Sequence, residues 1–239
     1  MIGEDLAYGV AIQPDGHIVL AGTSDGDFAV ARLAPRFEAF SAVFQYETVQ
    51  QILVQFSSAF VGLTNTDFVL DNLTTVTTIP SAQITLANLG NGLARLQFPG
   101  SSNNGIVGAL PDGNYRLTLP AVTATDTAGN TNVGPFTFDF FFLMADANRD
   151  KSVDTVDFNI LASNFGQVGK TFSQGNFSYD AGGNVDTIDF NLLAGSFGHT
   201  LPGDAPRPAA SSTPPAGSAP MFSETKVAGL DGGLVDVIE

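Results

Sequence analysis

Two acidic stretches toward the C-terminal end hold the residues best suited to chemistry. In the first, six oxygen-bearing residues fall at positions 1, 3, 5, 7, 9 and 12 of a twelve-residue loop: Asp146, Asn148, Asp150, Ser152, Asp154 and Asp157. This is the ligand spacing of a calcium loop, because alternate residues of a tight bend direct their oxygens toward one centre. Four carboxylates in twelve residues would also repel one another without a cation. The spacing predicts a Ca²⁺ site in which Ser152 uses its carbonyl and Asp157 binds from the start of a helix.

This loop departs from the usual pattern at two positions. Position 6 is Lys151 where glycine is normal, and a left-handed conformation costs a non-glycine residue roughly 1–2 kcal/mol. Position 12 is Asp157, which is shorter than the usual glutamate. Position 8 is the apolar Val153, as expected where two such loops pair side by side.

The second acidic stretch allows two alignments. Counting back from Asp189 places Ser178 at position 1 and Asp180 at position 3. The other alignment needs a two-residue insertion at Gly182-Gly183 and takes six residues as candidate ligands: Asn176, Ser178, Asp180, Asn184, Asp186 and Asp189. It has fewer carboxylates, which predicts weaker calcium binding. For both stretches the alternative is a solvated acidic turn that caps a helix through Asp154 or Asp186.

A short helix is predicted after each loop. Apolar residues at i, i+3, i+4 and i+7 are followed by glycine in both places: Phe158, Leu161, Ala162 and Phe165 before Gly166, and Phe190, Leu193, Ala194 and Phe197 before Gly198. Each helix is too short to persist alone, so we expect the two apolar faces to bury each other.

The stretches 153–166 and 185–198 are duplicates. A calcium loop followed by a helix, repeated twice with Asp at position 12, resembles the type I dockerin module, here over residues 143–199. The resemblance implies that the loop residues named above bind Ca²⁺, and it implies a protein partner, either cohesin-like or another surface protein. Cellulosomal dockerins carry a small hydroxyl pair after position 9, whereas this chain has Thr155-Val156 and Thr187-Ile188. We expect the apolar helix residues to be core.

The sequence pattern over residues 35–142 predicts an all-β domain. Candidate strands separated by turn residues lie at 52–56, 68–70, 82–86, 93–98, 115–119 and 136–140. Phe136, Phe138, Phe140 and Phe142 alternate onto one face. The stretches 110–115 and 125–130 resemble the late strands of bacterial Ig-like domains. That likeness implies a β-sandwich spacer with Tyr115 as a tyrosine corner.

Residues 7–34 predict short strands at 10–12, 18–21 and 28–31 around turns. The stretches 9–22 and 27–32 resemble one delta-sixty repeat of bacterial surface proteins, a family thought to form propeller-like arrays. A single repeat implies either lost upstream repeats or docking on its neighbour. At the other end, residues 200–239 predict a disordered Pro/Ala/Ser linker and an acidic tail.

Composition excludes several classes of function. Nine basic and 24 acidic residues give a net charge of −15, which argues against nucleic acid as a partner. The longest apolar stretch, 136–145, contains Asp139 and is half the length of a membrane span. Gly22-Thr23-Ser24-Asp25-Gly26 matches a nucleophile elbow, yet a strand is predicted after it where a helix is required.

The patterns predict a mainly β, non-catalytic, modular protein with calcium loops, and the resemblances imply a bacterial extracellular or cell-surface protein with a calcium-stabilised docking module. The first residues are not a secretory signal, which taken alone predicts a cytosolic chain. The resemblances to bacterial surface modules imply instead that the chain is the C-terminal part of a longer exported protein. The alternative is the accessory C-terminal part of a secreted polysaccharide-degrading enzyme whose catalytic domain is absent from this chain.

Overall fold

The computed structural model describes residues 6–13, 17–25, 27–33 and 36–203. These residues fall into two compact units, one before residue 35 and one from Arg36 onward. The predicted turn at 14–16 and the linker and tail beyond residue 203 lie outside the described residues.

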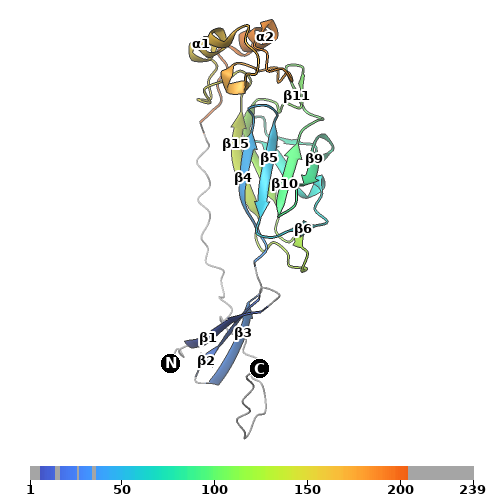
Figure 1. The fold of residues 1–239 in the computed structure, drawn as a ribbon, viewed down its shortest axis with the longest axis vertical. Coiled ribbons are helices and arrows are strands. Elements are labelled where there is room, and N and C mark those ends of the chain that lie inside the picture. Colours follow the sequence, from blue (N-terminus) through green and yellow to red (C-terminus); the bar gives the residue numbers. More distant parts are fainter. Residues whose placement is uncertain (1–5, 14–16, 26, 34–35, 204–239) are drawn as a thin grey trace. The chain divides into compact units, whose positions relative to one another are not determined.

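The N-terminal unit is an antiparallel sheet with the strand order β1-β2-β3 (Figure 1). Its strands are β1 (Leu6–Ile12), β2 (Ile18–Ser24) and β3 (Asp27–Leu33). All three predicted strands are therefore confirmed. Ser24 pairs with Asp27, so a strand follows the elbow-like motif and the strand-to-helix turn of a nucleophile elbow does not form there.

Residues 36–142, the β domain, contain two four-stranded antiparallel sheets. The first has the order β4-β5-β10-β9, with β4 (Ala39–Gln45), β5 (Gln51–Phe56), β10 (Leu93–Gln97) and β9 (Thr85–Asn88). The second has the order β15-β13-β7-β8, with β15 (Phe136–Phe142), β13 (Gly113–Leu119), β7 (Val69–Asn72) and β8 (Thr77–Ile79). Two short pairs complete the domain: β6 (Phe60–Val61) with β14 (Thr125–Asp126), and β11 (Ser102–Asn103) with β12 (Ile106–Val107).

Alternation of side chains builds the core of the β domain. Ile52, Val54 and Phe56 of β5 are buried, as are Tyr115 and Leu117 of β13, and both sheets contribute to one apolar cluster. On β15 the predicted phenylalanine face is found, since Phe136, Phe138, Phe140 and Phe142 all belong to this cluster or pack against it.

Two strand predictions need correction. Strand β4 was not predicted from the sequence, although Ala39 and Phe44 of this strand are buried. The strand predicted at 82–86 begins only at Thr85, because Pro80 leads into a 3₁₀ turn, η2 (Ser81–Gln83), that is closed by the Ile84 amide donating to the Ser81 carbonyl. Proline pre-sets a turn here and delays the strand.

Residues 143–203, which we call the two-loop module, pack against one end of the β domain near β4, β5 and β15 (Figure 1). The module contains α1 (Thr155–Asn164) and α2 (Thr187–Ser196), with η3 (Phe172–Gln174) between them; η1 (Asn65–Asp67) lies in the β domain. Both predicted helices are thus present. Within the described part of the chain, every helix is too short or too polar to cross a membrane.

Candidate functional site

The first loop is shaped by hydrogen bonds from its own backbone. The Asp146 carboxylate accepts the amides of Asp150 (3.1 Å) and Lys151 (3.0 Å), and Asp150 Oδ1 accepts the amide of Ser152 (2.9 Å). Lys151 has φ +71°, so position 6 takes the left-handed conformation although it is not glycine. The bend that the spacing predicted is therefore present, and Lys151 carries the backbone strain expected of a non-glycine residue at this position.

Asp157 joins the start of α1 to the start of the loop. Its Oδ2 accepts the Asp154 amide (2.9 Å), while its Oδ1 accepts the amides of Ala147 (2.8 Å) and Asn148 (3.3 Å). Asp154 caps the helix by accepting the Val156 amide (2.7 Å), so the capping role proposed as the alternative is present. Capping and metal binding are compatible, because a carboxylate has about four lone-pair positions.

The two ends of the first loop carry buried charge. Asp146 and Asp157 are both 0% exposed. Burial raises the pKa of Asp146 to about 6, and the negative charges of Asp157 and Asp150 add to the rise, although amide hydrogen bonds oppose it. Among the described residues, no lysine, arginine or histidine forms an ion pair with either carboxylate. A cation bound between them would compensate this buried charge.

The second loop repeats this arrangement with fewer charges. Asp189 is 0% exposed, and its oxygens accept the amides of Asp186 (2.9 Å) and Ser178 (2.8 Å), as Asp157 does in the first loop. Asp180 Oδ1 accepts the Asn184 amide (2.7 Å), which matches the bond between Asp150 and Ser152. These bonds follow the alignment that starts at Asn176, with the insertion at 182–183.

The remaining candidate ligands differ in exposure. Asn148 and Asp150 are exposed and hydrogen-bond each other (2.8 Å). Asn176 is buried, and its Oδ1 accepts the Ser178 hydroxyl (3.1 Å). In the part of the chain that the structure describes, no three His, Cys, Asp or Glu side chains gather into a metal-binding group. The four aspartates among the candidate ligands of the first loop therefore do not converge into one such group in this structure.

The expectation that the two loops pair with each other is wrong. Val153 exchanges backbone hydrogen bonds with His199 and Gly198 (both 2.9 Å), which follow α2. Val185, its counterpart, bonds to Gln167 (3.0 Å) and Gly166 (2.8 Å), which follow α1. Each loop therefore pairs with the segment after the opposite helix, because the chain reverses there and presents unpaired backbone groups.

The predicted helix face also needs correction. The buried positions begin one residue earlier than predicted, at Asp157 and Leu161 in α1 and at Asp189, Leu192, Leu193 and Ser196 in α2. The four phenylalanines expected in the core are substantially exposed: Phe158 (40%), Phe165 (49%), Phe190 (42%) and Phe197 (49%). The buried acid at the third helical position turns that side of each helix inward, and the phenylalanines move to the flank.

No family model matches the chain, and no curated protein matches it.

Proposed function

We propose that the two-loop module is a calcium-stabilised, dockerin-like module, and that the chain is a non-catalytic part of a modular bacterial extracellular or surface protein. The observation that carries this proposal is the pair of fully buried carboxylates, Asp146 and Asp157, which belong to one loop and, among the described residues, form no ion pair with a cationic side chain. Proteins compensate such groups by pairing them or by binding a metal ion.

In this proposal Ca²⁺ is held in the first loop by Asp146, Asn148, Asp150, Asp154 and Asp157, with the Ser152 carbonyl. The second loop uses Asn176, Ser178, Asp180, Asp186 and Asp189, with Asn184 at position 7. Its neutral Asn176 in place of an acid makes the second site weaker. The ion would act structurally, since it holds each loop in the shape that starts the following helix.

The exposed phenylalanines support a docking role. Phe158 and Phe190 occupy equivalent positions on α1 and α2, as do Phe165 and Phe197 after them. Large apolar side chains exposed at repeated positions are typical of a protein-binding surface. We propose that a cohesin-like or other surface protein docks here.

The β domain fits an Ig-like β-sandwich in the same proposal. The Tyr115 hydroxyl donates to the carbonyl of Pro111, four residues upstream (2.6 Å), and accepts from Asn72 Nδ2 (3.1 Å). This is the bond of a tyrosine corner. The β1–β3 sheet would be a propeller-type repeat fragment.

Calorimetric titration of the full chain with CaCl₂ tests the proposal. We expect a saturable heat of binding and an increase in thermal stability that EDTA reverses, because a metal that binds only the folded loops stabilises them. Magnesium at the same concentration serves as the control and should give much less, since it requires stricter octahedral geometry. No heat of binding, together with the same melting temperature in calcium and in EDTA, would reject the proposal.

Calcium affinity should fall as the pH is lowered through 6. The pKa of Asp146 is raised to about 6 in the folded protein, so below that pH a proton competes with the metal for this carboxylate. At pH 5 we expect binding to the first loop to be about tenfold weaker than at pH 7, measured by calorimetry in matched buffers.

In the metal-free protein, folding stability should depend on pH in the opposite direction and should be higher below pH 6 than above it. Because the folded pKa of Asp146 lies above its unfolded value, a protonated carboxyl favours folding, and the stability it contributes is lost as the pH rises through about 6. The variant Asp146→Asn should lack this component in EDTA. An affinity for calcium that does not change between pH 7 and pH 5 would contradict the assignment of Asp146 as a ligand.

A further inference from the structure

The fourth position of each loop contacts the β domain. Arg149 holds this position in the first loop and Tyr179 in the second, in the alignment that starts at Asn176. Both residues adopt the left-handed backbone conformation, with φ +64° for Arg149 and +55° for Tyr179. Two loops of different sequence therefore share an unusual backbone conformation at the same point.

Arg149 lies between two aromatic rings. Its guanidinium carbon is 4.2 Å from the centroid of the Tyr46 ring and 3.9 Å from that of Phe141, and its Nη2 donates to the Phe141 carbonyl (3.0 Å). Its Nη1 is buried without a hydrogen-bond partner in the described structure. The two aromatic faces thus contribute to the stabilisation of this cation, and partly buried cation–π contacts are stronger than exposed ones.

Tyr179 makes the corresponding contact from the second loop. Its ring stacks on Phe172 at 5.5 Å, and its hydroxyl accepts from Gln50 Nε2 (3.3 Å) in the β domain. Phe172 in turn meets the Tyr46 ring edge-on at 5.9 Å. Tyr46 therefore contacts Arg149 of the first loop directly and is connected to Tyr179 of the second loop through Phe172.

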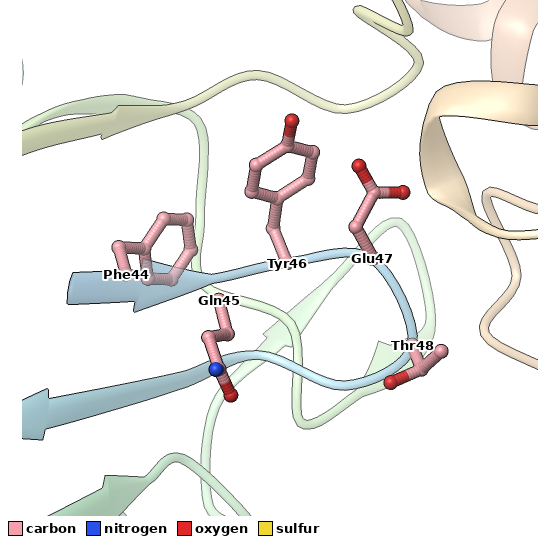
Figure 2. Close-up of a pocket in the computed structure, with 5 residues that line it drawn as sticks. All are labelled: Phe44, Gln45, Tyr46, Glu47 and Thr48. Atoms are coloured by element: carbon pink, nitrogen blue, oxygen red, sulfur yellow. The ribbon is translucent and has the colours of Figure 1, made fainter.

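Glu47 fixes the segment between the loops. Its carboxylate accepts the amide (3.2 Å) and hydroxyl (2.9 Å) of Ser173, while its carbonyl accepts the Phe172 amide (2.9 Å). Figure 2 shows Tyr46 and Glu47 projecting to the same side of the chain after β4, whereas Gln45 points to the other side. The five consecutive residues 44–48 line a pocket of about 350 Å³.

We infer that calcium binding by the loops and docking of the module on the β domain are thermodynamically linked, with Arg149 and Tyr179 as the positioning residues. The inference rests on the proposed function. For positions 3 and 5 to direct their oxygens inward, position 4 must point outward, and here it points into the β domain. The interface therefore stabilises the backbone conformation that calcium requires, and linkage makes the effect reciprocal.

Calcium titration of full-length Tyr46→Ala tests the coupling, because Tyr46 is outside the loops and is no ligand. We expect its calcium dissociation constant to rise about tenfold. Tyr46→Phe keeps the ring and should restore most of the affinity. Arg116→Ala, which removes a half-buried arginine paired with Asp139 on the same domain, should leave the affinity unchanged.

The variant Arg149→Ala distinguishes the proposed linkage from a purely electrostatic effect on calcium binding. Removing a cation near Asp146 would by charge alone strengthen calcium binding. The linkage instead predicts weaker binding, by several-fold. If the wild-type protein binds calcium while Tyr46→Ala binds equally well and Arg149→Ala binds more tightly, the inference is overturned and the proposed function stands. If the wild-type protein binds no calcium, both the inference and the proposed function are rejected.

Discussion

Replacing Phe172 with alanine is expected to destabilise the unit that begins at Arg36 by about 3–5 kcal/mol. The side chain is 0% exposed, and its ring contacts four other rings from both sides of the interface: Tyr46, Phe142, Phe177 and Tyr179. Its loss leaves a cavity where the β domain and the two-loop module meet, and neighbours held by strands and loops cannot collapse into it completely.

Urea denaturation of the full chain, followed by circular dichroism and tyrosine emission, measures this effect. The chain has four tyrosines and no tryptophan, so emission from Tyr46 and Tyr179 reports on the interface. Phe158→Ala is the matched control, because Phe158 is 40% exposed on α1, and it should cost less than about 1 kcal/mol. Equal losses for the two variants would contradict the assignment of Phe172 to the core and of Phe158 to the surface.

Asp146→Asn is expected to weaken calcium binding at the first loop by about two orders of magnitude, because it removes a ligand charge at position 1. The substitution keeps the size of the side chain. Its amide oxygen can still accept one of the two backbone amides that Asp146 binds, from Asp150 and Lys151. The folded structure should therefore persist in EDTA.

The decisive measurement is the increase in melting temperature that calcium produces. In the wild-type protein this increase should be large, and in Asp146→Asn most of it should disappear, while the melting temperature in EDTA changes little. Asp139→Asn, on the outer face of β15, removes a carboxylate that pairs with Arg116 and should leave the calcium response intact. A full calcium response in Asp146→Asn would show that the ion binds elsewhere.

The loops and helix starts could be predicted because they depend on short-range bonds. Asp154 and Asp157 are three residues apart, as are Asp186 and Asp189, and in each pair the second carboxylate accepts the amide of the first residue. Such capping boxes follow from spacing alone. The alternating strands of the β domain were predicted for the same reason, since a period of two places every other residue on one face.

The orientation of the helices could not be predicted in this way. The apolar pattern placed Phe158 inside, yet the buried face is centred on Asp157 and Leu161. A prediction from hydrophobic periodicity places an aspartate on the solvent-exposed face of a helix. The pattern cannot anticipate that backbone amides of the preceding loop would satisfy a fully buried carboxylate.

By itself, the order of residues determined where the first loop bends and where each helix begins. Only the tertiary structure decided what Arg149, Phe172 and Tyr179 do. Their partners Tyr46, Glu47 and Gln50 lie about a hundred or more residues earlier in the chain, and Glu47 and Ser173 are 126 positions apart. Contacts at that separation form when two folded surfaces meet, and no local spacing encodes which surfaces those will be.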